Sequence, residues 1–231
     1  MTWLQRLELP RIELDVVPDH LAPYLERAAR AGVQTAFFDA TTDLGIPTVY
    51  SVHVAPYHRT LRTVVMCATE PAPAVATGKV LREYVSCLRA MEDRESPPTD
   101  PYDCVELHHG AMFMSRPDRA PAFGFLLDSP RRVSLSQLPK FDFESGAAHL
   151  RFLLDRLASK NMEAFAVDLT TDESDRVGVT VVRVVVPDLQ PLSPIYRAQF
   201  RGHPRLYDAP RAMGHVVHPE EDLNPWPQPF A

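Results

Sequence analysis

The stretch "GVQTAFFDATTDLGIPTVYSVHV" at residues 32–54 and the stretch "NMEAFAVDLTTDESDRVGVTVVRVVV" at residues 161–186 share one pattern. Each has an apolar run, then Asp-x-Thr-Thr-Asp, then a second run rich in β-branched residues. Asp39 and Asp168 open the two motifs. Aspartate and threonine favour turns because their side chains hydrogen-bond the nearby backbone, so each stretch predicts two strands joined by a turn.

A helical pattern precedes each of these stretches. Apolar residues recur at helical spacing in "HLAPYLERAARAG" (20–32) and in "GAAHLRFLLDRLASKN" (146–161). Chance could match single Asp and Thr residues, but the same elements in the same order make coincidence the weaker interpretation. The sequence therefore predicts an α+β fold with mixed sheets, packed helices and an internal α-β-turn-β repeat, at about 20–55 and 146–187.

Further elements follow from the same kind of pattern. Residues 61–69 predict a third strand, residues 78–94 a strongly amphipathic helix, residues 104–115 a helix, and residues 124–145 an irregular segment. The run "RVGVTVVRVVVP" (176–187) is apolar at nearly every position, which predicts a long central strand. Arg183 interrupts it, and since a buried unpaired charge is costly, its side chain must face solvent, a carboxylate or an anion.

The totals set limits on the class of protein. A chain of 231 residues suits one largish domain or two small ones, and we interpret it as a single truncated domain over 1–231. The formal net charge of −6 argues against nucleic acid and anionic membranes as partners. No apolar run is long enough to span a bilayer, and the first residues do not have the pattern of a signal peptide. The three widely spaced cysteines suit a reducing cytoplasm.

The last part of the chain has a different character. Residues 188–231 form a loop-rich arm that ends in "DLNPWPQPFA" (222–231), where Pro225, Pro227 and Pro229 alternate with other residues. Such a segment has a preset extended shape, so it loses little entropy when it is laid into a cleft.

Four stretches carry a resemblance to a known family: "TWLQRLELPRIELDVVP" (2–18), "FFDATTDLGIPTVYSV" (37–52), "ATGKVLREYVSCLRA" (76–90), and "VTVVRVVVPDLQPL" (179–192) together with "RGHPRLYDAP" (201–210) and the proline-rich tail. The chain resembles the C-terminal part of YcaO-domain proteins, the azoline-forming cyclodehydratases of peptide natural-product biosynthesis. The resemblance implies a YcaO-like fold and a reaction on a ribosomal precursor peptide. A Cys, Ser or Thr side chain attacks a backbone amide, ATP with magnesium phosphorylates the oxyanion, and an azoline ring remains.

The resemblance also implies a set of site residues. Glu83 falls on the family's helix carboxylate that holds magnesium on the nucleotide, although an exposed helix glutamate is the plainer interpretation. Ser86 stands where the family has Gln, Arg89 stands near the motif's Arg, and Arg205 belongs to the closing segment; each is a candidate for nucleotide binding.

The tail prolines, Pro225, Pro227 and Pro229, are candidates for the active site, because the family's tail enters it. The alternatives are a docking peptide for another protein or a surface segment. His108 and His109 are interpreted as structural, because adjacent histidines on a helix point in different directions.

The family's first ATP motif, Ser-x-x-Glu-x-x-Glu-Arg, has no counterpart in this sequence. A start codon placed too late, a split enzyme or a degenerate paralogue would each explain this. We therefore expect a partner, either an E1-like or nucleotide-binding subunit or a second copy of the chain. Two functions remain open: a cyclodehydratase component that is active with its partner, and a non-catalytic scaffold or peptide-binding subunit.

Overall fold

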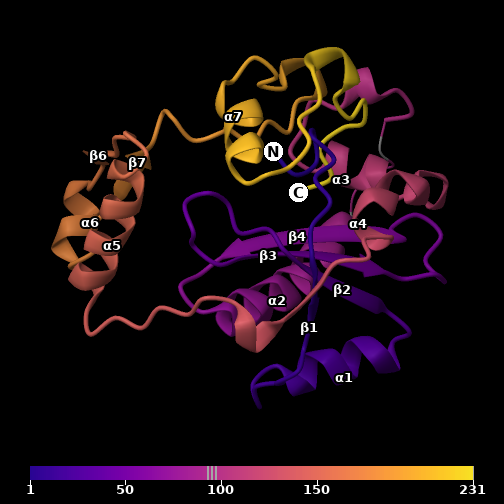
Figure 1. Ribbon diagram of the computed structural model, residues 1–231, viewed down its shortest axis with the longest axis horizontal. Helices are drawn as coiled ribbons and strands as arrows, with labels where there is room; N and C mark the ends of the chain where they lie inside the picture. The colour runs from indigo at the N-terminus through magenta and orange to yellow at the C-terminus, as the bar shows by residue number, and fades with distance from the viewer. Residues whose placement is uncertain (93, 95, 97, 231) are drawn as a thin grey trace. The chain divides into compact units, whose positions relative to one another are not determined.

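The computed structural model describes residues 1–92, 94, 96 and 98–230 (Figure 1). Asp93, in the predicted second helix, and Ala231, the end of the predicted tail, lie outside the described residues. The chain divides into two compact units: residues 1–142 with 191–231 form unit 1, and residues 143–190 form unit 2. The assignment of residues 1–231 to a single domain stays a prediction.

Unit 1 is built on a five-stranded sheet in the order β4-β3-β2-β1-β5. The strands are β1 (Arg11–Glu13), β2 (Gln34–Asp39), β3 (Thr48–Val54), β4 (Thr63–Thr69) and β5 (Arg132–Ser134). All neighbours pair antiparallel except β1 and β5, which are parallel, so the sheet is mixed as predicted. The interior strand β3 is buried along nearly its whole length.

Helices cover both faces of this sheet. The helix α2 (Pro73–Glu92) packs on β3 and β4 through Val80, Leu81 and Tyr84, and α1 (Ala22–Arg30) lies beside it. On the other face, Phe38 and Tyr50 pack with residues of α3 (His109–Met114) and α4 (Gly124–Leu127). Figure 1 shows α1 and α2 on one side of the sheet and α3, α4 and α7 (Arg205–Ala212) on the other.

The predicted repeat is confirmed. The turn after β2 is held by the backbone NH of Thr41, which donates to Asp39 Oδ1 at 3.0 Å. In unit 2, the NH of Thr170 donates to Asp168 Oδ1 at 2.9 Å. The hydroxyl of the same threonine accepts a second hydrogen bond from a backbone NH at the beginning of the next strand. Thr48 N donates to Thr41 Oγ1 at 3.2 Å, and Val181 N, just before β7, donates to Thr170 Oγ1 at 3.0 Å.

Each strand pair also follows a helix. In unit 2, α5 (Gly146–Ala158) precedes β6 (Phe165–Asp168), which pairs antiparallel with β7 (Val182–Val185). The two copies differ in the turn itself, because a short helix, α6 (Asp172–Arg176), lies within the second turn. The local hydrogen bonds of the motif are therefore the same in both copies, while the loop that follows differs.

The prediction of a long central strand over 176–187 is wrong. The strand β7 has four residues, pairs only with β6 among the described strands, and is exposed throughout. Gly178, with a φ of 72°, lies in the turn that precedes it. Arg183 on β7 is exposed, which avoids the cost of burying its charge. The apolar run therefore indicates a strand, but not how many neighbours it has.

Several boundaries also shift. The helix expected over 104–115 begins only at His109, and the helix expected from residue 78 begins at Pro73. The segment over 124–145 contains α4 and β5, and the C-terminal arm contains the helix α7. Within the described residues, no helix has the length and apolar character that a membrane crossing requires.

A buried histidine lies between the sheet and α2. His53 Nδ1 is 3.2 Å from Thr35 Oγ1, and His53 Nε2 is 2.9 Å from Ser51 Oγ. The imidazole stacks on Tyr84 with ring centroids 4.1 Å apart. Burial lowers the pKa of His53 to about 3, so the neutral ring is the form that the folded protein holds.

We predict that this histidine makes the fold acid-sensitive. The unfolded chain takes up a proton near an ordinary histidine pKa of about 6.5, whereas the folded chain does so only near pH 3. Stability from this group is therefore complete above pH 6.5 and is lost as the pH falls, by about 1.4 kcal/mol per unit. Urea unfolding at pH 6.5 and pH 5 measures the slope. His53→Gln should flatten it, while His20→Gln, at an exposed histidine, should not.

Candidate functional site

The C-terminal tail is docked on unit 1 in an extended form. Its burial alternates: Pro225 is exposed, whereas Pro227 and Pro229 are buried. Asn224 anchors its start, because its backbone NH donates to Leu4 O at 2.8 Å and its side chain donates to Trp3 O at 3.1 Å. The tail therefore has one face against the protein, as a segment laid into a groove would have.

Trp226 fixes the middle of the tail. Its carbonyl accepts a hydrogen bond from Trp3 Nε1 at 3.2 Å. The guanidinium of Arg119 lies 4.6 Å from the centre of the Trp226 ring and 4.8 Å from that of Phe113. Arginine binds aromatic faces through the ring quadrupole, so Arg119 joins the tail to α3.

The tail also passes very close to the backbone of α3. A Cβ atom at Gly110 would lie 2.3 Å from the carbonyl oxygen of Gln228, a distance that real Cβ contacts do not reach. Only glycine leaves room for the tail at this point. Gly110 is not among the site residues predicted from the sequence, although a glycine inside a helical pattern often has a packing reason.

The end of the tail reaches strand β3. The Phe230 ring meets the Tyr50 ring edge-on, with centroids 5.3 Å apart. Tyr50 is 2% exposed, and its hydroxyl has no hydrogen-bond partner among the described residues. Burial, with Cys67 nearby, raises the pKa of Tyr50 well above its usual value, so the hydroxyl keeps its proton. Tyr50 is a second residue of this region that was not predicted from the sequence.

Cys67 on β4 is the strand neighbour of Tyr50. Cys67 lies at the surface, yet the surrounding protein desolvates its thiol and raises its pKa, and the carboxylate of Glu83 adds to this rise. Glu83 is half-buried on α2, whose apolar face packs on the side of the sheet opposite to Tyr50. We call Tyr50, Cys67 and Phe230 the tail-end cluster.

Ser86 and Arg89 do not join this cluster. Both are exposed on α2. The Ser86 hydroxyl donates to the carbonyl of Arg82 in its own helix, at 3.4 Å. Their assignment to nucleotide binding stays a prediction.

Arg205 is engaged in an ion pair. Its Nη2 lies 2.6 Å from Asp43 Oδ1 and its Nη1 lies 3.3 Å from Asp43 Oδ2, with both side chains about one-tenth exposed. Asp43 is the last residue of the first Asp-x-Thr-Thr-Asp motif, so this pair holds α7 against the turn. The structure thus gives Arg205 a structural role, and its role toward a nucleotide stays a prediction.

The described residues contain no group of three His, Cys, Asp or Glu side chains placed to hold a metal ion. Glu83 offers one carboxylate, the kind of ligand that magnesium prefers. His109 Nε2 lies 3.5 Å from Glu106 Oε2, and the interpretation of His108 and His109 as structural stays a prediction.

Comparison with known proteins places the chain in a family. The sequence model of the family described as "YcaO cyclodehydratase, ATP-ad Mg2+-binding" matches residues 1–190. The chain belongs to the YcaO family. ATP and magnesium are the cofactors that this family's description gives.

Three similar proteins show what share of a longer protein this chain covers. An uncharacterised protein of Methanothermobacter thermautotrophicus is 28% identical over 80% of this chain and 47% of its own length. A heterocyclase in complex with substrate and cofactor has a TM-score of 0.77 at 20% identity, over 99% of this chain and 29% of that one. YcaO from Methanopyrus kandleri, bound with AMPPCP and Mg2+, has a TM-score of 0.56 at 21% identity, over 79% of this chain and 46% of that one. The chain thus spans half or less of the proteins it matches.

We predict that Gly110→Ala releases the tail without unfolding unit 1. The added methyl group needs the space of the Gln228 carbonyl, so the tail must move. Trp226 fluorescence should shift to the red and protease cleavage within residues 224–230 should become faster. Gly202→Ala is the matched control, because a Cβ there meets nothing within 4 Å. Equal cleavage of both variants would contradict the proposed close contact.

Proposed function

We propose that this chain is a component of an ATP-dependent cyclodehydratase that forms azolines on Cys, Ser or Thr residues of a precursor peptide. The observation that carries the proposal is the docked tail, whose last described residue contacts Tyr50 beside Cys67. Membership of the YcaO family gives the reaction class. We therefore assign the family's reaction to the tail-end cluster of this chain.

The chemistry requires a positioned amide and a leaving oxygen. A substrate side chain adds to the amide carbonyl, and ATP, when bound, supplies the phosphoryl group that turns the oxygen into a leaving group. The tail holds one wall of the cluster in place with little loss of entropy. The Tyr50 hydroxyl remains protonated, so its group can donate a hydrogen bond to an oxygen that develops charge.

The proposal includes a partner. Unit 2 has exposed large apolar side chains on α5, β6 and β7, namely Leu150, Leu154, Phe165, Val167, Val182 and Val184. Apolar surfaces of this kind seldom stay in water. They favour a complex with an E1-like or nucleotide-binding subunit, or with a second copy of the chain.

A non-catalytic scaffold or peptide-binding subunit is the second candidate. The ion pair of Arg205 with Asp43 favours it, because this arginine is already neutralised. The hydrogen bond of Ser86 within its own helix points the same way.

We predict that replacing Pro225, Pro227 and Pro229 together by Ala abolishes ring formation while the complex still assembles. The change keeps Trp226 and Phe230, whose burial is worth roughly 1.5–3 kcal/mol each, but it makes the free tail flexible. Ordering it then costs about 1 kcal/mol or more per residue. Mass spectrometry of the precursor peptide, with loss of water as the signal, measures ring formation. Pro219→Ala, at an exposed proline of the same arm, is the control.

One outcome of this experiment would overturn the catalytic interpretation of the tail. If the triple proline variant forms rings normally but no longer binds its partner, the tail is a docking peptide.

We also predict that the isolated chain binds ATP weakly or not at all, because its sequence has no counterpart of the family's first ATP motif and Arg205 is paired. Titration calorimetry with magnesium tests this. Micromolar affinity for the chain alone would refute the prediction. In the complex, Glu83→Gln should weaken ATP binding, whereas Glu163→Gln, on the exposed surface of unit 2, should not.

A further inference from the structure

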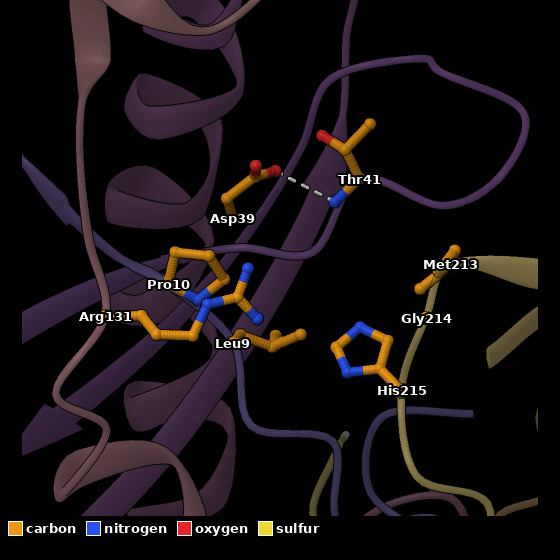
Figure 2. A pocket seen from close by; sticks show the side chains of 8 residues that line it. All are labelled: Leu9, Pro10, Asp39, Thr41, Arg131, Met213, Gly214 and His215. Atoms are coloured by element: carbon orange, nitrogen blue, oxygen red, sulfur yellow. Dashed lines mark hydrogen bonds between the residues drawn. The ribbon is translucent and has the colours of Figure 1, made fainter. Parts of the chain in front are cut away.

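A cavity of about 400 Å³ opens in unit 1 and shares no lining residue with the tail-end cluster. Four segments form its walls: Leu9 and Pro10 before β1, Asp39 and Thr41 in the first motif, Arg131 before β5, and Met213–His215 after α7 (Figure 2). This volume is within the range of cavities that hold small ligands.

The walls are fixed by backbone hydrogen bonds. Asp39 N donates to Pro10 O at 2.9 Å, and Arg11 N donates to Arg131 O at 2.9 Å. The fourth wall follows α7, where His215 N donates to Pro210 O at 2.9 Å. The Asp43–Arg205 ion pair holds this helix against the motif turn. The cavity is therefore preformed, which lowers the cost of ordering a site when a ligand binds.

Two nitrogen-bearing side chains point into the cavity from different walls. Figure 2 shows the Arg131 guanidinium and the His215 ring directed toward one another across Leu9. Neither side chain makes a hydrogen bond or ion pair with another residue in the described ranges 1–92, 94, 96 and 98–230. A guanidinium presents paired donors that match the two oxygens of a carboxylate.

Acidic groups nearby limit the charge that the cavity can accept. Asp39 lies in the wall, although its Oδ1 already accepts the hydrogen bond from Thr41 N. Burial lowers the pKa of His215, Arg131 lowers it further, and Glu8 acts in the opposite direction. A doubly charged oxyanion would be repelled by both Asp39 and Glu8, whereas a singly charged group would be repelled less.

We propose that this cavity binds a singly charged carboxylate, held by Arg131 and by a proton-bearing nitrogen of His215. Leu9, Pro10 and Met213 contact the apolar part of the group that carries it. An acidic side chain and the free end of a peptide both present this group, and the experiment below separates them. This binding site does not require that the chain form azolines.

Acetate titration, followed through the His215 ring signals by NMR, tests the proposal. Acetate should shift these signals saturably and raise the pKa of His215, because an anion stabilises the imidazolium. Arg131→Gln should weaken binding by about tenfold or more, the loss of one charge-assisted pair. Arg27→Gln, at an exposed arginine of α1, is the matched control and should bind as the parent does.

Binding measurements with other probes define the ligand. Inorganic phosphate at neutral pH should bind more weakly than acetate, and tighter phosphate binding would overturn the assignment to a carboxylate. The peptides acetyl-Gly-Asp-Gly-amide and acetyl-Gly-Gly-Gly with a free carboxylate separate an acidic side chain from a chain end, and binding of either supports the site. The proposal is wrong if no probe shifts His215, or if Arg131→Gln leaves binding unchanged. Neither result bears on ring formation, which is measured separately.

Discussion

Hydrogen bonds between residues 3–5 and residues 218–226 join distant parts of the chain, and both candidate sites depend on them. The Trp3 indole donates to Trp226 O and Trp3 O accepts from Asn224, at 3.2 and 3.1 Å. The Gln5 side chain donates to His218 O and accepts from His218 N, at 3.1 and 2.8 Å. These bonds satisfy polar groups beside a buried apolar cluster, where unpaired groups would be costly. They direct the tail toward Tyr50, and they hold the segments that carry Leu9 and His215 side by side. The course of the tail is thus set by tertiary contacts, because its own proline pattern fixes only its extended shape.

The parts of the fold that the sequence predicted are those with local causes. The turn of the first motif depends on Asp39 and Thr41, two residues apart, so its pattern is visible in the sequence. The stripe of Val80, Leu81 and Tyr84 predicted α2 for the same reason. The run over 176–187 led to the wrong prediction of a long central strand. Its β-branched residues indicate a strand with apolar side chains, while the number of neighbouring strands is a property of the whole fold. β7 pairs with β6 alone among the described strands, and its valines are exposed.

The candidate site was predictable only where a motif carried it. The resemblance to the YcaO family gave Glu83 and the tail prolines as site candidates. Tyr50, in contrast, has the sequence pattern of an ordinary core aromatic residue within a strand. Its importance comes from a hydroxyl that is buried without a partner among the described residues, which no sequence pattern reveals. A buried hydroxyl of this kind costs about 1–3 kcal/mol, so its retention favours a use for it. The contacts of Gly110 and Arg205 were not predicted for a related reason, since their partners, Gln228 and Asp43, are more than 100 residues away in the chain.

The two copies of the repeat show where local and tertiary causes separate. Asp43 and Asp172 occupy the same position of the motif, and the hydrogen bonds before them are the same. Asp43 pairs with Arg205 in the interior, where the loss of one partner would leave an uncompensated charge, at a cost of about 3–5 kcal/mol. Asp172 is exposed in the first turn of α6, where the positive end of the helix dipole favours a carboxylate. The motif therefore specifies a turn in both units, and the surroundings of its last aspartate decide what that turn holds. In unit 1 it holds α7, and through α7 the wall that carries His215.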